Sequence, residues 1–385
     1  MDATELQDVL TAVRSFVRET VVPLEDEIEE TDAVPDIVRK TAAEMGLFGY
    51  ALPEEYGGLG LTVTEQVQVV MELGWTTPAL RSMVGTNNAI GGHVLLLGGT
   101  DEQKREWLPR MASGEVVGSF GLTEADAGSD PSTLRTKAVR DGGDWLVTGS
   151  KRYITNAPQA DVIFTFARTL PDAPPSRGIA NLIISTDSPG FTIGKRDHKM
   201  GQAGAWSSDV HFDDVRVPGD RLIGGEEGVG TGFATAMRCL AHGRLHIAAL
   251  SVGMAQRAVA EMTRFAQERE QGGRPIASYQ LVQGLVADSV TELMAARALV
   301  LESARAYDDG SDRKVAASAA KYFASEAVGR IADRAVQVFG GAGYVRGVPV
   351  ERIYRDARLL RLYEGTSQIQ QVIIAKATLG AAARG

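Results

Sequence analysis

One carboxylate, Glu364, lies at a predicted turn in the stretch LYEGTSQIQ (362–370), with a leucine and a tyrosine before it and Gly365 after it. Thr366 or the serine that follows it is suited to cap the next helix. An acid among apolar neighbours is costly to ionise, so its pKa rises and it accepts a proton more readily near neutral pH. A structural glutamate would be expected on a solvated face or beside a basic partner four residues away, so the stretch leaves open what this acid does.

A glycine-containing turn, SFGLTEADAGSD (119–130), holds Thr123, Gly128 and Ser129. Exposed backbone N–H groups and hydroxyls in such a turn can bind a phosphate or the edge of a heteroaromatic ring. When the segment is taken alone, an ordinary turn rich in aspartate explains it equally well.

The stretch KRYITNA (151–157) has the pattern of a strand, so Tyr153 and Thr155 should lie on one face, an aromatic ring beside a hydroxyl. Such a pair can support a flat ligand. Packing in the core is the more common explanation for an isolated pair of this kind.

Other chemistries are disfavoured by the sequence. No Gly-x-Gly-x-x-Gly follows a predicted strand, and the glycines of GGEEGVGTGF (224–233) have the wrong spacing for a Rossmann fingerprint. His242 and His246 are four residues apart and should share one helical face, but no third ligand accompanies them, so we expect no metal site. No motif for a nucleophilic serine or cysteine stands out.

The composition indicates a globular protein with room for two or three domains. The chain has 385 residues, a net charge of −9 and a pI near 5.3, which argue against a nucleic-acid surface. Its single cysteine, Cys239, suits a reducing compartment. The acidic, amphipathic start differs from a signal peptide, and no apolar run is long enough for a membrane span. We therefore expect a cytoplasmic protein.

Three zones differ in the period of their apolar residues. Residues 1–117 and 226–385 show the three-and-four spacing of helices, and the second of these zones contains three long helical patterns. Residues 118–225 alternate between apolar and polar, with a hairpin signal at Asp141-Gly142-Gly143. Helix starts are predicted at Thr62 or Thr64 and at Thr100 or Asp101. The order predicted is helical, β, helical.

Several stretches, in this order, resemble the flavin-dependent acyl-CoA dehydrogenases over nearly the whole chain. They are MGLFGYALPEEYGGLG, GTDEQKREWLP, GLTEADAGSD, GSKRYITNA, MGQAGAWSSDVHFDDVRVP, QVFGGAGYVRGVPVERIYRDAR and LYEGTSQIQ. The resemblance implies an α+β multidomain fold: an N-terminal α-helical domain (1–117), a middle β-barrel-like domain (118–225) and a C-terminal four-helix bundle (226–385). This agrees with the three zones.

The resemblance also implies a reaction. Glu364 would remove the α-proton of an acyl-CoA thioester while FAD takes the β-hydrogen as hydride, which gives a trans-2-enoyl-CoA. The electrons would pass to an electron-transferring flavoprotein. A homotetramer built as a dimer of dimers is implied as well.

The resemblance assigns roles by matched position. The residues implied to contact the flavin are Phe120, Leu122, Thr123, Gly128, Ser129, Tyr153 and Thr155, together with Thr366 and Gln368. Those implied to hold the adenine-diphosphate half of FAD on a neighbouring subunit are Arg269, Gln271, Gln337 and Gly341. Those implied to contact the substrate are Ser129, Arg244, Tyr363 and Gly365.

Three positions depart from the family pattern. Gly272 replaces an aromatic that packs on the cofactor, and Ala241 replaces an aspartate typical of members that act on small or branched acids. Some members carry their base at the position of Gly243, so the glycine leaves Glu364 as the candidate.

Two alternatives remain open. An acyl-CoA oxidase or flavin monooxygenase could share this fold, although the long C-terminal extension of the oxidases is missing and monooxygenase relatives usually lose the Tyr-Glu-Gly-Thr motif. A non-catalytic subunit that binds acyl-CoA is disfavoured by the intact motif. The acyl group is not identified; we expect its pocket to involve residues 86–96, Tyr363 and the helix around residue 240.

Overall fold

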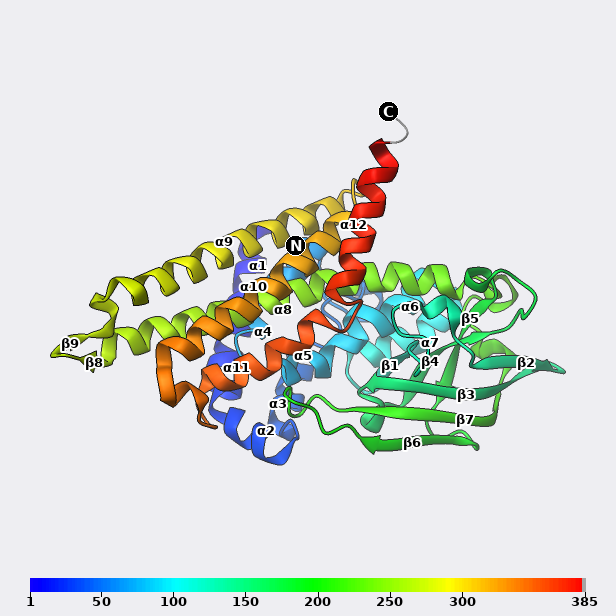
Figure 1. Ribbon diagram of the computed structural model, residues 1–385. Helices are drawn as coiled ribbons and strands as arrows, with labels where there is room; N and C mark the ends of the chain where they lie inside the picture. Colours follow the sequence, from blue (N-terminus) through cyan, green and yellow to red (C-terminus); the bar gives the residue numbers. More distant parts are fainter. Residues whose placement is uncertain (383–385) are drawn as a thin grey trace.

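Helices occupy both ends of the chain and a sheet lies between them in sequence, as Figure 1 shows for the computed structural model, which describes residues 1–382. The N-terminal helices are α1 (Ala3–Ser15), α2 (Glu25–Thr31), α3 (Asp36–Glu44), α4 (Val63–Leu73), α5 (Pro78–Gly85), α6 (Gly92–Gly98) and α7 (Asp101–Ala112). Thr62 and Thr100 form the capping boxes of α4 and α7, which decides between the predicted starts.

The middle region is one curled sheet. Its strands are β1 (Gly118–Gly121), β2 (Lys137–Asp141), β3 (Asp144–Thr155), β4 (Val162–Arg168), β5 (Ile179–Ser185), β6 (Phe191–Arg196) and β7 (Ser207–Val217). They lie in the order β1-β4-β2-β3-β7-β6, with β5 paired to β4. The predicted hairpin joins β2 to β3 through Gly142, whose φ of +62° suits a glycine. The strand β1, which pairs parallel to β4, was not predicted.

The C-terminal region contains three long helices and two shorter ones. They are α8 (Gly232–Glu268), α9 (Gln280–Asp308), α10 (Val315–Phe339), α11 (Pro349–Ala357) and α12 (Ser367–Ala382). A small hairpin, β8 (Glu270–Gln271) and β9 (Arg274–Pro275), joins α8 to α9. In Figure 1, α8 runs from the sheet to this hairpin, α9 and α10 lie beside it, and α12 projects from the bundle.

The long helix α8 carries Gly243 and Gly253 without a break. A Cβ at Gly253 would lie 2.2 Å from the carbonyl oxygen of Met71, so this glycine lets α4 and α8 approach closely. One hydrophobic core runs through both helical regions, and two further clusters lie in and around the sheet. The predicted fold is confirmed, whereas the domain limits at 117/118 and 225/226 stay a prediction.

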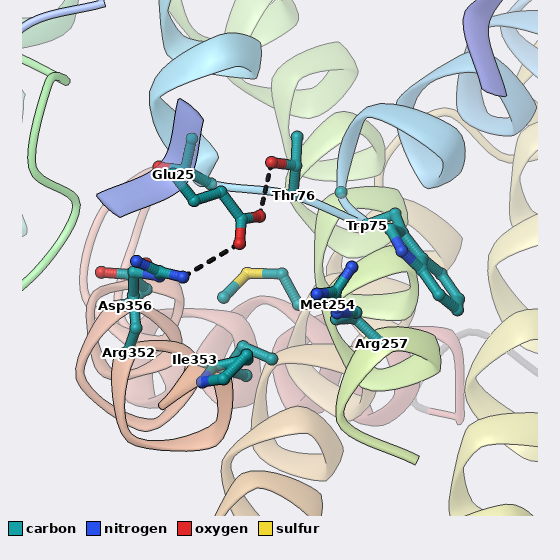
Figure 2. Close-up of a pocket in the computed structure, with 11 residues that line it drawn as sticks. Glu25, Trp75, Thr76, Met254, Arg257, Arg352, Ile353 and Asp356 are labelled. Atoms are coloured by element: carbon teal, nitrogen blue, oxygen red, sulfur yellow. Dashed lines mark hydrogen bonds and ion pairs between the residues drawn. The ribbon is translucent and has the colours of Figure 1, made fainter. Parts of the chain in front are cut away.

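A buried polar network ties α11 to the N-terminal helices (Figure 2). Thr76 donates to Glu25 at 2.6 Å, and the other carboxylate oxygen of Glu25 accepts from Arg352 at 2.9 Å. The cavity beside them measures about 10 Å³, room for roughly one water molecule. One turn further along α11, Asp356 accepts the backbone N–H of Gln202. The network therefore fixes the helix that leads into the Glu364 turn.

None of the helices within residues 1–382 is both long and apolar enough to span a bilayer.

Candidate active site around Glu364

Side chains from three helices hold the backbone of the Glu364 turn. Glu364 and Gly365 both have left-handed backbones, with φ of +54° and +90°. Arg244 on α8 donates to the Glu364 carbonyl at 3.3 Å, and Lys321 on α10 donates to the Gly365 carbonyl at 2.7 Å. Gln370 on α12 donates to both carbonyls, at 3.2 and 2.8 Å. These donors hold two residues that would otherwise favour a different backbone.

The Glu364 side chain is buried, with 9% of it exposed. Its Oε2 atom has no hydrogen-bond partner within residues 1–382. A Cβ at Gly243 would lie 2.1 Å from that oxygen, so α8 covers the carboxylate closely. We expected the preceding Leu362 to help bury the carboxylate, and this is wrong, because 46% of the Leu362 side chain is exposed. It is α8, at Gly243, that passes closest over the acid.

Three cations face this carboxylate. Arg81 Nη2 lies 3.9 Å from Glu364 Oε1, and Arg244 and Lys321 lie behind the turn. Burial raises the pKa of Glu364, and the charges of Arg81, Arg244 and Lys321 oppose that rise. Burial likewise lowers the pKa of Lys321 to about 8. A raised pKa and a free carboxylate oxygen are the properties of a general base.

The other residues of the motif differ in role: some side chains form hydrogen bonds within the chain, and others have no partner among the described residues. The Thr366 hydroxyl accepts the N–H of Ile369 at 3.3 Å, so Thr366 caps α12 as predicted. Ser367 donates to Glu326 at 2.6 Å. The Gln368 side chain is exposed. The Tyr363 hydroxyl is buried and has no hydrogen-bond partner within residues 1–382.

Tyr153 lies on an open face of the sheet. A bulge between Lys151 and Ile154 gives Tyr153 a φ of +58° and leaves 61% of it exposed, with Arg152 stacked 4.6 Å from the ring centroid. Thr155 is half-buried and follows the buried Ile154. The bulge interrupts the alternation of β3 at Tyr153, so the pairing of this ring with the Thr155 hydroxyl stays a prediction.

The turn after β1 is anchored by Glu124. This carboxylate accepts the N–H groups of Arg135 and Thr136, at 2.6 and 2.9 Å, and the ammonium of the buried Lys151 at 2.7 Å. The anchored turn exposes Gly128 and Ser129. A flat ligand could approach the backbone there, because no described atom lies within 4 Å of a Cβ built on Gly128.

Other predicted flavin contacts are less exposed. Thr123 is half-buried, and Phe120 packs on Phe166 with ring centroids 4.8 Å apart. The Leu122 side chain lies in the core at 5% exposure, which leaves its backbone for a ligand contact. The exposed ring, the hydroxyls and the glycine turn together fit a flat heteroaromatic group with polar edges.

A direct link joins this face to the acid. Asn156, the residue after β3, donates to the Ser82 carbonyl at 2.8 Å and to the Thr86 hydroxyl at 2.9 Å. Ser82 follows Arg81 on α5, and Arg81 contacts Glu364. Through α5, the end of β3 is thus linked to the residue that contacts the carboxylate.

Four predicted cofactor residues lie elsewhere. Arg269, Gln271, Gln337 and Gly341 are all exposed, at the end of the bundle where Phe265 stacks on Phe339 with centroids 4.1 Å apart. Arg269 is 25 residues beyond Arg244, which corresponds to roughly 37 Å of helix at ~1.5 Å per residue. A single chain does not bring the two sets together.

Gly272 has a local explanation. It and Gly273 form the two-residue turn between β8 and β9, with φ of +61° and +73°. Such a turn favours glycine over an aromatic residue. The departure at Gly272 therefore accompanies a tight hairpin.

The paired histidines serve the core. His242 and His246 both contact Gln66 Oε1, at 2.8 and 2.9 Å, from one face of α8 as predicted. Burial lowers the pKa of His242 to about 4 and holds that of His246 well below its ordinary range. Among the described residues, no group of three His, Cys, Asp or Glu side chains is arranged to hold a metal ion.

Sequence reasoning missed Arg81, Lys321 and Gln370. Arg81 lies outside the segments expected to form the acyl pocket, and its signal was a lone charge in TTPALRSMVG, a run of small and apolar residues. Lys321 was one lysine in an alanine-rich helix. Nothing in their spacing relates them to Glu364.

Comparison with known proteins shows which family the chain resembles. Family models named "Acyl-CoA dehydrogenase", for the N-terminal, middle and C-terminal domains, match residues 3–115, 119–215 and 230–379. An acyl-CoA dehydrogenase of Bacillus subtilis is 40% identical over 368 residues, 96% of each chain.

Solved structures agree as well. A structure described as the electron transferring flavoprotein of Acidaminococcus fermentans superposes with a TM-score of 0.94 at 35% identity, covering 98% of this chain and 100% of that one. Butyryl-CoA dehydrogenase from Megasphaera elsdenii superposes with a TM-score of 0.93 at 32% identity, covering 97% and 98%. With a relative 40% identical along 96% of its length and all three domain models matched in order, the chain belongs to the acyl-CoA dehydrogenase family.

Proposed function

We propose that this acyl-CoA dehydrogenase removes the α-proton of its acyl-CoA substrate with Glu364 and releases a trans-2-enoyl-CoA. The observation that carries the proposal is the state of the carboxylate: buried, with a raised pKa and a free Oε2. A base of this kind takes a proton from a weak carbon acid more readily than an exposed glutamate does.

Members of this family depend on FAD, and the open face of the sheet fits its flavin. Tyr153 would support the ring, while Thr155, Thr123 and Ser129 would supply hydroxyls to its edge. Phe120, the backbones of Leu122 and Gly128, and Thr366 and Gln368 would complete the contacts. When bound, FAD supplies the acceptor for the β-hydrogen.

The chain's own residues orient the acid and the thioester. Arg244, Lys321 and Gln370 fix the carbonyls of the turn, so the carboxylate meets the α-carbon in one position. The positive charges of Arg244 and Lys321 would also stabilise negative charge that develops as the proton leaves. We assign substrate contacts to Ser129, Arg244, Tyr363 and Gly365.

The proposed partners follow from the family and from the remote residues. The names of two relatives, the Acidaminococcus structure and a caffeyl-CoA reductase–Etf complex subunit, support an electron-transferring flavoprotein as acceptor. The exposed set at Arg269, Gln271, Gln337 and Gly341 supports a homotetramer in which each chain reaches a neighbour's FAD. The free, buried thiol of Cys239 supports a location in the cytoplasm, where thiols stay reduced.

The test is the Glu364→Gln variant. The amide keeps the shape and removes the basicity, so the protein should fold, bind FAD and bind acyl-CoA, while flavin reduction falls at least 10²- to 10⁴-fold. Anaerobic bleaching of the flavin by a panel of acyl-CoA thioesters measures the reduction step, and a separate assay with a dye as electron acceptor measures turnover. A variant that retains more than about a tenth of the rate would exclude Glu364 as the base.

A further inference from the structure

Arg81 is a buried cation with two unsatisfied donor nitrogens among the described residues. Its side chain is 8% exposed, and neither Nε nor Nη2 donates a hydrogen bond to any atom of residues 1–382. Its ion-pair contact is Glu364 Oε1 at 3.9 Å, beyond hydrogen-bonding distance. A buried guanidinium with free donors normally has an acceptor, because an unsatisfied buried charge is costly.

The fold makes room for this arginine. A Cβ on Gly85, one turn further along α5, would lie 3.0 Å from the Arg81 guanidinium carbon and from its Nε. Any side chain at position 85 would therefore crowd Arg81. Gly85 thus leaves the space that the guanidinium occupies.

The charges around Glu364 are unbalanced. Arg81, Arg244 and Lys321 oppose one carboxylate, which leaves two positive charges in excess if all four groups are ionised. Arg244 and Lys321 have carbonyl partners, so the unpaired donors are those of Arg81. His242 and His246, which sense the Arg81 charge, have lowered pKa values from burial and supply no anion.

We propose that Arg81 receives an anionic group at the end of a short acyl chain, so that the substrates are CoA thioesters of dicarboxylic or similarly acidic short acids. This rests on the proposed function, because it places the thioester's α-carbon at Glu364. A guanidinium binds a carboxylate through two parallel N–H donors, which are the atoms left free here.

The geometry limits the chain length. An α-carbon within about 3 Å of Glu364 Oε1 lies within roughly 7 Å of Arg81 Nη2, given the 3.9 Å between them. A carboxylate two or three carbons beyond the α-carbon spans that gap. Succinyl-CoA and glutaryl-CoA are therefore the probes, and butyryl-CoA and pentanoyl-CoA are their uncharged partners of equal length.

The experiment compares ratios. We expect the wild-type holoenzyme to reduce its flavin with an acidic thioester 10- to 100-fold more efficiently than with the matched neutral one, in kcat/KM. Arg81→Met should remove that preference, and Arg81→Lys should retain part of it. Since Arg81 also lowers the pKa of Glu364, its loss can slow both substrates, but that effect cancels in the ratio. A ratio near one in the wild type, or one unchanged in Arg81→Met, would overturn the proposal.

A binding measurement keeps the inference testable if Arg81→Met does not fold or if no thioester is turned over. The Glu364→Gln holoenzyme should bind succinyl-CoA or glutaryl-CoA at least about 10-fold more tightly than the neutral partner by calorimetry. Equal or weaker binding of both acids overturns the arginine's role. Bleaching by butyryl-CoA as fast as by succinyl-CoA would leave the proposed dehydrogenase function intact while rejecting the acidic substrate. Failure of every thioester to bleach the flavin would instead reject the proposed function.

Discussion

At the scale of single residues, the position of the Glu364 carboxylate depends on the absence of a side chain at Gly243. The carboxylate fills the place of the missing side chain on α8, since a Cβ there would lie 2.1 Å from Oε2. Glycine in a helix interior costs about 0.5–1 kcal/mol relative to alanine. At position 243 the glycine, despite this cost, leaves space for the acid, and burial raises the pKa of Glu364.

We therefore expect Gly243→Ala to reduce the rate of flavin reduction by about 100-fold, because the new methyl displaces the carboxylate by an ångström or more. The matched control is Gly284→Ala on α9, where no described atom lies within 4 Å of a built Cβ. That variant should keep full activity and gain about 0.5–1 kcal/mol in the free energy of unfolding. Stopped-flow reduction and thermal melts measure both. Wild-type rates in Gly243→Ala would refute the steric role of the glycine.

The sequence alone predicted Glu364 and its cap but not its environment. The motif and the absence of an alternative base at Gly243 indicated the acid. That Arg81, Lys321 and Gln370 meet it depends on α5, α10 and α12 converging from separate parts of the chain. Spacing within one helix carries no information about that meeting, and the exposed Leu362 shows that neighbours in sequence need not bury a residue.

At the scale of elements, the turn is a junction of helices. Donors from α8, α10 and α12 hold its carbonyls, and α11, which leads into it, is fixed by Arg352 on Glu25 and by Asp356 on Gln202. Burial raises the pKa of Asp356 to about 7. Asp356 contributes to the polar packing between α11 and the loop before β7, because it accepts the backbone N–H of Gln202. The base is thereby placed by rigid elements.

Lys321→Met tests this support. Loss of the Gly365 contact should loosen the two left-handed residues and lower kcat roughly 10- to 100-fold, with FAD content and KM little changed. Because Lys321 lowers the pKa of Glu364, its removal raises that pKa further. A base must be deprotonated, so the rise of kcat with pH should move to higher pH in Lys321→Met.

The pH profile separates this role from simple loss of packing. Arg81 and Arg244, the other cations that face Glu364, remain in the variant. Lys321→Arg keeps a charge and should keep the wild-type acid limb even if the turn fits less well. The exposed Lys376 on α12 provides a control, and Lys376→Met should match the wild type. An unshifted acid limb in Lys321→Met would contradict the electrostatic part.

Some elements were predictable and others were not. Capping boxes at Thr62 and Thr100 and the hairpin at Gly142 have local signals, and the structure confirms them. The π-helical turn Thr86–Gly91 has none, because Asn87 and Asn88 stabilise it by donating to carbonyls distant in sequence, such as Val116 and Leu47. The short β1 exists because β4 pairs with it.

At the scale of the whole molecule, α8 lies between two regions that we propose to bind ligands. Gly243 and Arg244 lie in its first half, at the acid, and Arg269 directly follows its last residue, next to the β8–β9 hairpin. Figure 1 shows α8 running from the sheet to that hairpin. The change of period along the chain predicted the order helical, β, helical. It could not predict this separation, because the uninterrupted length of α8 across Gly243 and Gly253 depends on tertiary packing against α4 and the Glu364 turn.

The separation leads to a prediction about assembly. If Arg269 binds the pyrophosphate of a neighbour's FAD, a cofactor that bridges two chains stabilises the assembled state by mass action. Arg269→Ala should then lose FAD on gel filtration and shift toward smaller species, while its helical circular dichroism stays unchanged. Arg264→Ala is the matched control on the same helix. Its side chain is 57% exposed and pairs with Glu261 and Glu268, which contributes at most about 1 kcal/mol, so assembly and colour should persist. In that case Arg269 carries more of the contact, because Gly272 offers no ring to the cofactor. An Arg269→Ala protein as yellow and as large as the wild type would show that each chain holds its FAD alone.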